Sequence, residues 1–219
     1  MRPHVRHAKA DRQSLTVSPE SKNLHVSSYE HMQRMVSAKL DRERSLHAVD
    51  IGSYDVNGSY RTLFDSPNWR YTGIDLEAGP GVDVVLTSPY RFPLPTATAD
   101  VVLSGQAFEH IEFFWLTWLE MLRVLKPGGL IFLIAPSRGP EHRYPQDCWR
   151  FYPDGYRALA KFGGCELLEV STDWEPHPEE WSGPWGDTVG VFRGRGLGLR
   201  QRLALSLMRR AFAGKGQAA

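Results

Sequence analysis

Short apolar runs alternate with amphipathic or polar segments along most of the chain. The runs LHAVDI, YTGID, VDVVL, DVVLS and GLIFLIA lie between residues 46 and 135. Such runs are typical of parallel strands that helices cover on both faces. Between them, WLTWLEMLRVL has helical spacing and stops at KPGG, and a weaker helix is expected at residues 156–162, before Gly163 and Gly164. The pattern therefore predicts an α/β chain.

The two ends of this pattern predict different structures. Residues 1–26 are polar and have no period, so we expect a flexible arm. A helix is predicted from a cap at Ser27 or Ser28 to about Arg44, because apolar residues recur there at helical spacing. Further along, CELLEVSTD and DTVGVFR predict two strands that pair as an antiparallel hairpin at the sheet edge. We expect the folded domain to cover residues 27–195.

Residues 196–219 are predicted to form a basic amphipathic helix and tail. From residue 193 onward the chain has seven cations and no acid. The predicted helix has one apolar stripe, made of Leu199, Leu203, Leu207 and Ala211. This stripe could contact an anionic membrane peripherally, pack on a partner such as the second copy in a homodimer, or dock on its own domain.

The composition argues against several classes of function. Lys and Arg (26) nearly balance Asp and Glu (25), so no overall charge favours nucleic acid as a partner. The two cysteines, Cys148 and Cys165, are too few for a disulfide framework and form no C-x-x-C pair. No apolar run approaches the roughly 20 residues of a membrane span, and the polar start lacks the apolar core of a signal peptide. We expect a cytoplasmic protein.

The stretch AVDIGSYDVNGSYR, residues 48–61, is predicted to join a buried strand to a ligand-binding loop. A parallel strand that ends at Ile51 delivers this loop to the sheet edge where open α/β folds bind small molecules. Gly52 and Gly58 allow the backbone to turn and to approach a ligand closely. Their spacing does not match the G-x-G-x-x-G of a dinucleotide site, and the loop has no Gly-Lys-Ser or Gly-Lys-Thr. The loop is therefore not expected to bind phosphate.

Two carboxylates at neighbouring strand ends indicate the ligand. Asp75 closes the next strand, 25 residues after Asp50. A carboxylate at this strand end is placed to accept hydrogen bonds from both hydroxyls of a ribose. Asp50 is expected either to face a cationic amino group or to hold the loop through backbone N–H groups. A ribose without phosphate and a positive charge together indicate S-adenosylmethionine as the cofactor.

Four consecutive segments resemble the motifs of the class I, S-adenosylmethionine-dependent methyltransferases. They are VDIGSYDVNGSYR, YTGID, ADVVLSGQAFEHI and WLEMLRVLKPGGLIFLIAP, and they lie at about residues 46–136. The resemblance implies a Rossmann-like fold, with a mostly parallel seven-stranded sheet, helices on both faces and an antiparallel C-terminal strand hairpin.

The resemblance also implies which residues bind the cofactor. They are Asp50, Gly52, Ser53, Tyr54, Gly58, Asp75, Leu76, Ser88, Gly105 and Gln106. Two departures from the family pattern bear on this set. Tyr54 and Val56 replace the usual small residues of the first loop, and Thr87 and Ser88 stand where many relatives carry an acidic residue for the adenine amino group.

The segment PSRGPEHRYPQDCWRFYPDG follows the fifth strand, where we expect the methyl acceptor to bind. A hydroxyl acceptor has a high pKa and needs a general base or a metal. We predict His142 as the base and Asp147 as its orienter or a substrate ligand, with His110 as a further candidate. An aromatic platform with charged groups suits a polyhydroxylated ring. The expected acceptor-binding residues are Tyr144, Trp149 and Arg150.

This segment is similar to that of small saccharide methyltransferases, which implies transfer to a hydroxyl of a saccharide or glycoside, small or oligomeric. Several alternatives stay open. Asp147 and Arg150 would pair and brace the loop while Trp149 packs in the core, or Asp147, His110 and Glu109 would converge to hold Mg²⁺. A second alternative is that the acceptor is a lipid or another small metabolite. A third is that the protein is a catalytically silent scaffold.

Overall fold

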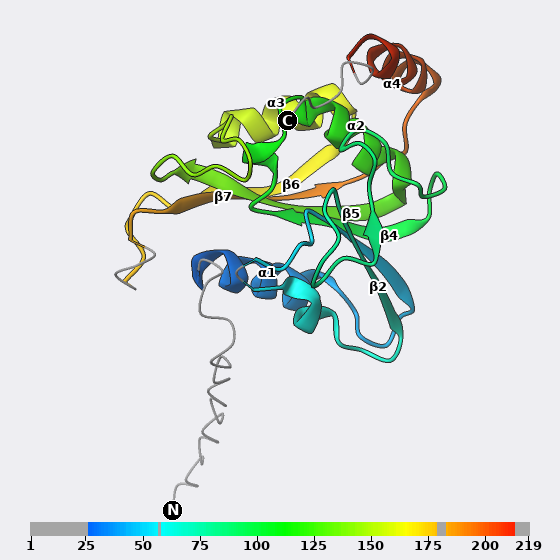
Figure 1. Cartoon of the computed structure of the whole chain (residues 1–219). Coiled ribbons are helices and arrows are strands. Elements are labelled where there is room, and N and C mark those ends of the chain that lie inside the picture. Colours follow the sequence, from blue (N-terminus) through cyan, green and yellow to red (C-terminus); the bar gives the residue numbers. More distant parts are fainter. Residues whose placement is uncertain (1–25, 57, 179–182, 213–219) are drawn as a thin grey trace, which may run out of the picture.

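The computed structural model describes residues 26–56, 58–178 and 183–212. The predicted arm, apart from Val26, and the last seven residues of the tail lie outside the described residues. Seven strands form one sheet in the order β3-β2-β1-β4-β5-β7-β6, with helices on both faces (Figure 1). This architecture is the Rossmann-like fold that the sequence predicts.

The strands pair as the sequence pattern predicts. Their bounds are β1 Leu46–Ile51, β2 Trp69–Asp75, β3 Val84–Val85, β4 Ala99–Gly105, β5 Leu125–Arg138, β6 Glu166–Thr172 and β7 Gly186–Arg193. Neighbouring strands from β3 to β5 are parallel, so their carboxyl ends meet at one edge of the sheet. β7 is antiparallel to both β5 and β6, and the β6–β7 hairpin closes one side of the sheet.

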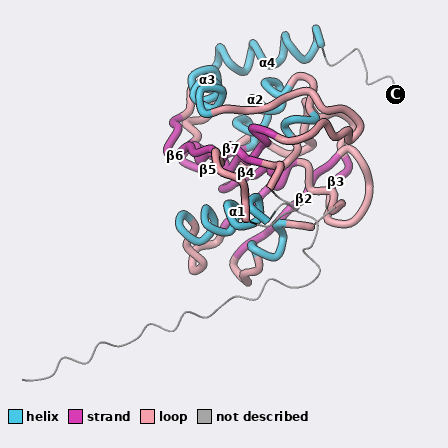
Figure 2. The backbone as a smooth tube through the Cα atoms, turned by 90° about the vertical axis from the view of Figure 1, so that its left-hand side faces the viewer, coloured by secondary structure: helices cyan, strands magenta, loops and turns pink. Residues whose placement is uncertain are grey.

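The helices cover the two faces unequally (Figures 1 and 2). Their bounds are α1 Val26–Lys39, α2 Phe114–Val124, α3 Pro153–Gly163 and α4 Leu199–Phe212, with short 3-10 helices η2 Tyr60–Phe64 and η3 Phe108–His110. α1 packs on β5 and β7 from one face, beside η2. α2 and α3 pack together on the other face, and α4 lies over α2. Of the described helices, none is long and apolar enough to cross a bilayer.

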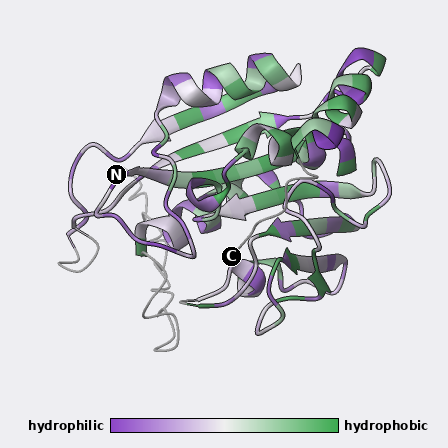
Figure 3. Cartoon of the chain, turned by 45° about the horizontal axis from the view of Figure 1, so that its top comes forward, coloured by the Kyte–Doolittle hydropathy of each residue, from purple (hydrophilic) through white to green (hydrophobic). Residues whose placement is uncertain are grey.

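Two hydrophobic cores lie on opposite sides of the sheet. Along β5, Ile131 and Leu133 belong to the core under α2 and α3, whereas Phe132 and Ile134 belong to the core under α1. This alternation follows from the two-residue period of a strand, which points successive side chains to opposite faces. Hydrophobic residues (green) follow the strands in Figure 3. Burial on both faces is the reason that the strands read as continuous apolar runs.

The first helix differs from its prediction at both ends. It ends at Lys39, before Arg44, and Ser27 and Ser28 lie within it. The Ser28 hydroxyl is 2.6 Å from the hydroxyl of Tyr60, and the Ser27 hydroxyl donates to Asp187. The two serines are therefore buried tertiary contacts instead of caps.

The KPGG segment is part of β5, although the sequence suggested a turn before the strand. α2 ends at Val124 and β5 begins at Leu125. Leu125 pairs with Ala99, but the next paired residue of β5 is Leu130, so the segment between them bulges from the ladder. Gly128, with a φ of 83°, supplies the left-handed conformation within this bulge.

Candidate active site

A cavity of about 600 Å³ lies at the carboxyl ends of β1, β2 and β4. Its volume is within the usual range for small-molecule sites, and its position is where open α/β sheets bind ligands. All of the predicted cofactor residues line it except Ser88. The Ser88 hydroxyl instead accepts a hydrogen bond from the backbone N–H of Tyr90, which keeps it in its own turn.

A second cavity, of about 610 Å³, lies away from these strand ends, between α2, α4 and the segment before β4. Three of its lining residues already form ion pairs with one another. Glu120 is fully buried and pairs with Arg123 at 2.7 Å and with Arg209 of α4. These contacts fix α4 to α2, so we assign this cavity a structural role and place the active site at the strand ends.

Asp50 is a buried carboxylate at the end of β1. Its side chain is only 2% exposed, and the hydroxyl of Tyr71 donates a hydrogen bond to Oδ2. Oδ1 has no hydrogen-bond partner among the described residues. Burial raises the pKa of Asp50 to about 7, although the hydrogen bond from Tyr71 opposes the shift. A cationic ligand group beside Oδ1 would satisfy this carboxylate.

Asp75 ends β2, one strand over from Asp50. One carboxylate oxygen accepts the backbone N–H of Tyr54 at 3.0 Å, and the other accepts that of Glu77 at 3.2 Å. These two bonds fix the carboxylate while each oxygen keeps a lone pair. Because Asp75 also lines the cavity, it can accept hydrogen bonds from two neighbouring hydroxyls of a ligand.

The loop after β1 is packed closely against its neighbours. Gly52 has a φ of 80°, and a Cβ there would lie 2.5 Å from Cβ of Ala107. The bulky Tyr54 is accommodated by Gly79, where a Cβ would lie 1.9 Å from the tyrosine ring. The departure of Tyr54 from the family pattern is therefore matched by a glycine elsewhere, and the loop still borders the cavity.

The end of β4 connects the cavity to α1. Gly105 packs on the ring of Tyr60, and Gln106 follows with a φ of 60°, which is unusual for a residue with a side chain. The Gln106 amide donates to Ser28 at 3.1 Å and to Asp187 at 2.9 Å. Burial raises the pKa of Asp187 to about 6. Gln106 Oε1 has no partner within the part of the chain that the structure describes, so it stays available to a ligand donor.

The other end of the cavity is built from η3 and the loop after β5. His110 Nδ1 donates to the backbone carbonyl of Gln146 at 2.5 Å, and the Gln146 amide donates to the carbonyl of His110 at 3.0 Å. The backbone N–H of Cys148 donates to the carbonyl of Glu109 at 2.7 Å. These reciprocal bonds dock the loop on η3, although the two segments are 36 residues apart.

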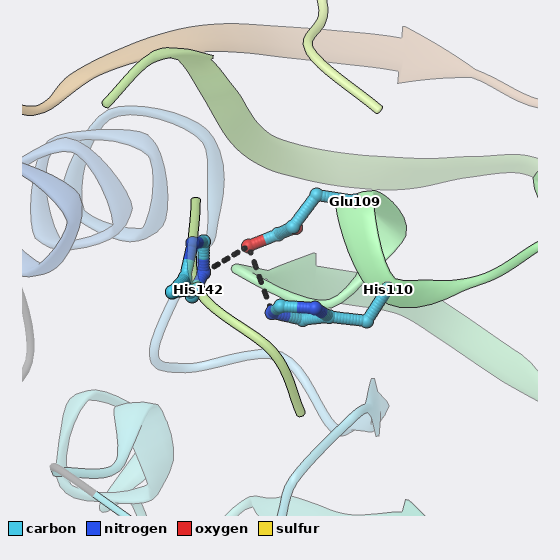
Figure 4. A group of neighbouring side chains, drawn as sticks. All are labelled: Glu109, His110 and His142. Atoms are coloured by element: carbon cyan, nitrogen blue, oxygen red, sulfur yellow. Dashed lines mark ion pairs between the residues drawn. The ribbon is translucent and has the colours of Figure 1, made fainter. Parts of the chain in front are cut away.

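Glu109, His110 and His142 converge at this junction (Figure 4). Glu109 Oε1 is 3.5 Å from His110 Nε2 and 3.8 Å from His142 Nε2. Glu109 is completely buried, while the two imidazoles line the cavity. The adjacent Glu109 carboxylate raises the pKa of His142, partly against the effect of burial.

Asp147 lies behind His142. Its Oδ2 accepts the backbone N–H of His142 at 2.9 Å and lies 3.4 Å from Nδ1 of the same ring. Arg150 binds both carboxylate oxygens, at 2.5 and 2.8 Å, and holds the pKa of Asp147 well below its usual range. The pairing alternative for Asp147 and Arg150 is therefore observed, together with contact between Asp147 and His142.

The three predicted acceptor-binding residues lie in different places. Tyr144 lines the cavity and is 57% exposed. Trp149 and Arg150 do not line it. The Trp149 indole packs edge-on against Phe114 and donates to the backbone carbonyl of Ile111, which turns it towards α2.

Comparisons with known proteins find similarity to methyltransferases. Residues 49–133 match the family model for a methyltransferase domain. An uncharacterized methyltransferase of Mycobacterium bovis is 33% identical over 130 residues, which cover 52% of this chain and 48% of that protein. A probable S-adenosylmethionine-dependent methyltransferase of Mycolicibacterium smegmatis is 33% identical over 121 residues, covering 54% of this chain and 41% of that protein. The chain spans about half the length of these curated relatives.

Solved structures share the fold. The 1,6-didemethyltoxoflavin-N1-methyltransferase of Burkholderia thailandensis, with bound 1,6-didemethyltoxoflavin and S-adenosylhomocysteine, has a TM-score of 0.60 at 16% identity and covers 77% of this chain and 78% of its own. A SAM-dependent methyltransferase from Aquifex aeolicus has a TM-score of 0.54 at 14% identity, covering 77% and 94%. The chain therefore has a methyltransferase fold, and residues 49–133 match the methyltransferase domain family.

Sequence reasoning missed polar residues that do not line the cavity themselves but contact residues that do. Asp187 is the second residue of β7 and the only acid in that strand, which was an available signal. Tyr71 contacts Asp50 only because β1 and β2 pair in this register, which the sequence alone does not specify. Glu109 was considered as an oxygen ligand together with His110 and Asp147. The structure instead groups Glu109 with His110 and His142, while Asp147 binds Arg150.

Proposed function

We propose that this methyltransferase domain transfers a methyl group from S-adenosylmethionine to a hydroxyl of a saccharide or glycoside. The observation that carries the proposal is the placement of His142 at the cavity wall, between Asp147 and the buried Glu109. A hydroxyl is a weak nucleophile, so its methylation needs a group that takes the proton. An imidazole between two carboxylates is suited to that task.

The strand-end half of the cavity fits the cofactor. Asp75 would accept the ribose hydroxyls, and the unsatisfied Oδ1 of Asp50 would face a positive charge of the ligand. When bound, S-adenosylmethionine supplies an electrophilic methyl group on a positively charged sulfur. The loop residues Gly52 and Tyr54 would border this ligand and exclude water from it.

His142 would act on the acceptor from the opposite half. The acceptor oxygen gains the methyl group, its proton passes to Nε2 of His142, and the electron pair of the broken carbon–sulfur bond stays on sulfur. Asp147 and Glu109 would stabilise the imidazolium that forms, because both carboxylates lie within 4 Å of the ring nitrogens. The raised pKa of His142 favours this proton transfer. His110 would help to orient the His142 imidazole indirectly, because it contacts the Glu109 carboxylate that lies beside His142.

Exposed aromatic side chains around the loop after β5 favour a sugar ring as the acceptor. Tyr144 borders the cavity directly. Tyr152 and Trp174 do not line it, but they stack with their planes 12° apart and both are at least half exposed, so they could extend the contact surface for a larger saccharide. Flat apolar faces beside charged groups bind the apolar face of a pyranose while the charged groups bind its hydroxyls.

A panel of radiolabelled methyl-transfer reactions tests the acceptor class. The protein is incubated with labelled S-adenosylmethionine and with monosaccharides, glycosides, oligosaccharides or lipid extracts. We expect label in a saccharide product, with turnover lost in His142→Ala. Label only in lipid products would refute the saccharide proposal. Calorimetry with S-adenosylmethionine provides the control, because binding without any transfer, or no binding at all, would favour a silent scaffold.

A lipid or lipid-linked acceptor is the second candidate, and one observation favours it. The outer side of α4 exposes Leu199, Leu203 and Leu207 by 75%, 57% and 64%, and Arg200 and Arg210 are exposed beside them. An apolar stripe with flanking cations suits an anionic membrane surface. A second copy of the chain would also cover such a face. Sedimentation with anionic vesicles and a measurement of oligomeric state distinguish these partners.

A further inference from the structure

We infer that Glu109, His110 and His142 form a binding site for a divalent transition-metal ion. The three ligand atoms, one from each side chain, all lie within 4.8 Å of one another (Figure 4). Ligands bound to a common ion at about 2.0–2.2 Å lie roughly 3–4 Å apart. The distances from Glu109 Oε1 to the two Nε2 atoms, 3.5 and 3.8 Å, already meet this requirement.

The Glu109 carboxylate lacks any other compensation. It is 0% exposed, and neither oxygen has a hydrogen-bond partner among the residues that the structure describes. An uncompensated buried carboxylate costs several kcal/mol in proteins. A cation held at Oε1 would remove this cost. Among the described side chains, the two imidazoles of His110 and His142 lie close enough to Oε1 to bind the same cation.

The hydrogen bond of His110 fixes which of its nitrogens is available. Nδ1 faces the carbonyl of Gln146, which can only accept, so Nδ1 carries the proton. In the neutral ring Nε2 then presents a lone pair towards the Glu109 oxygen. Two acceptors that face each other at 3.5 Å need a cation or a proton between them. A backbone carbonyl on Nδ1 is also the usual way in which a metal-binding histidine is oriented.

The ring of His142 is held less directly. Its Nδ1 has no hydrogen-bond partner among the described residues but lies 3.4 Å from Oδ2 of Asp147, and Arg150 holds that carboxylate in place. A carboxylate behind a histidine strengthens the histidine as a metal ligand. Both imidazoles therefore present Nε2 to the Glu109 oxygen and are backed at Nδ1 by an oxygen atom.

Two imidazoles and one carboxylate select the class of ion. Zn²⁺, Co²⁺, Mn²⁺, Fe²⁺ and Ni²⁺ accept such a donor set, whereas Mg²⁺ and Ca²⁺ prefer oxygen ligands alone. Three protein ligands leave coordination positions open, and His110 and His142 border the cavity. A bound acceptor hydroxyl at an open position would become more acidic.

The role of the ion in making the acceptor hydroxyl more acidic rests on the proposed function, whereas the ion site itself does not. With an ion bound, Nε2 of His142 is a ligand and the hydroxyl proton passes to water. Without it, Nε2 is free to accept the proton directly. The Asp147–Arg150 ion pair supports His142 both with and without a bound ion.

Cobalt and zinc titrations test the site without cofactor or acceptor. The full chain, without a polyhistidine tag, is stripped with a chelator, dialysed, and titrated with Co²⁺ by visible absorption and with Zn²⁺ by calorimetry. We expect one ion per chain and the ligand-field absorption of Co²⁺ bound to nitrogen. Glu109→Gln and His110→Ala should weaken binding on the order of 100-fold, and Asp147→Asn about 10-fold or more through the orientation of His142. His177→Ala, which removes an imidazole outside the cluster, should bind as the wild type does.

Thermal unfolding separates loss of the site from loss of the fold. Without metal, Glu109→Gln should unfold at a higher temperature than the wild type, because it removes a buried charge. Zn²⁺ should raise the unfolding temperature of the wild type but not that of Glu109→Gln. Failure of Zn²⁺ and Co²⁺ to bind the wild type below millimolar concentration would overturn the inference, as would equal binding by Glu109→Gln. A metal-free protein that still methylates a hydroxyl would overturn the role of the ion and leave the proposed function intact.

Discussion

The two halves of the cavity are stabilised in different ways. The half that we propose binds the cofactor (the cofactor half) consists of strand ends and the turns that follow them. There, Asp75 accepts two backbone N–H groups and the sheet register sets the position of each carboxylate. The half that we propose binds the methyl acceptor (the acceptor half) consists of the 3-10 helix η3 and the loop after β5. There, Glu109 is buried with both oxygens unsatisfied by the described residues.

The turn that holds Asp75 has satisfied hydrogen bonds, so we expect it to keep its geometry without the ligand. Asp50 Oδ1 and Gln106 Oε1 in the same half have no partner among the described residues, but each of these side chains has another oxygen or nitrogen that is hydrogen-bonded, whereas neither oxygen of Glu109 is. A buried carboxylate without donors is costly unless a proton or a cation joins it. The acceptor half is therefore the part whose stability and geometry should respond most to what is bound.

The largest expected effect comes from the acceptor half. His142→Ala should lower turnover by about 10²–10⁴-fold, the range for loss of a general base or an equivalent activating group. Cofactor affinity should stay within about twofold of the wild type, since His142 and Asp75 share no hydrogen-bond partner among the described residues. Initial rates at saturating cofactor and calorimetry measure the two quantities. Wild-type turnover in the variant would remove His142 from the mechanism.

The next effect concerns the cofactor half. Asp75→Ala should weaken binding of S-adenosylmethionine by roughly 1–3 kcal/mol, because charge-assisted hydrogen bonds to the ribose are lost. Calorimetry gives the affinity, and Co²⁺ titration of the same variant gives the state of the other half. Co²⁺ binding should not change. Unaltered cofactor affinity would refute the ribose assignment, and a change in both quantities would show that the halves are coupled.

A smaller effect is expected from the titration of Asp50, whose folded pKa is about 7. Between pH 6 and pH 8 the carboxylate becomes ionised, so affinity for the cationic cofactor should rise about tenfold if Asp50 faces its positive charge. Asp50→Asn should lack this pH dependence. Calorimetry at pH 6, 7 and 8 compares the two proteins, and parallel curves would exclude Asp50 as the group responsible.

The same pKa predicts a change in stability without cofactor. Because burial raises the folded pKa above the unfolded value of 3.8, the stability from protonated Asp50 is full below pH 4 and is lost as pH rises towards 7. The loss should be on the order of 2–4 kcal/mol for a fully buried group. Asp50→Asn should therefore gain stability relative to the wild type at pH 8 but not at pH 4, as urea unfolding at the two pH values would measure.

The smallest effect belongs to α4, which lies outside both halves. Replacing Leu199, Leu203 and Leu207 by Ser should leave turnover on a small saccharide within about twofold, since these side chains are exposed. The unfolding temperature should also change little. A large loss of activity on a small acceptor would show that the outer face of α4 takes part in the reaction.

The sheet could be predicted from the sequence because strands that are buried on both faces consist of mainly apolar residues. The runs that became β1, β4 and the second part of β5 are mainly apolar and buried, and turn residues bound them. β2 and the edge strand β6 are more mixed and more exposed. All but one of the predicted cofactor residues line the cavity, because a residue at or just after the carboxyl end of a parallel strand has little choice of position. Ser88 was misplaced because it lies in a turn beyond the short β3, where no strand fixes its direction.

The acceptor half was harder to predict because it depends on how one loop docks. The sequence identified His142 and Asp147, yet nothing in it indicates that Gln146 would bind His110 and so bring Glu109 beside both imidazoles. Trp149 was expected at the acceptor, but the same docking turns its indole towards α2. Contacts between segments far apart in the chain decide these positions, and local patterns do not record them.

Hydrogen bonds join α1 to residues of the cavity wall. The folded unit that holds the cavity is therefore larger than residues 49–133, which match the family model. Ser28 touches both Tyr60 and Gln106, and Met32 is fully enclosed beneath the sheet. Yet α1 lies entirely before residue 49, where the family match starts. A protein trimmed to residues 49–133 would lose the α1 contacts that hold Tyr60 and Gln106 at the cavity wall, and it would also lose the lining residues 142–145. Its inactivity would therefore say nothing about the chemistry of the intact chain.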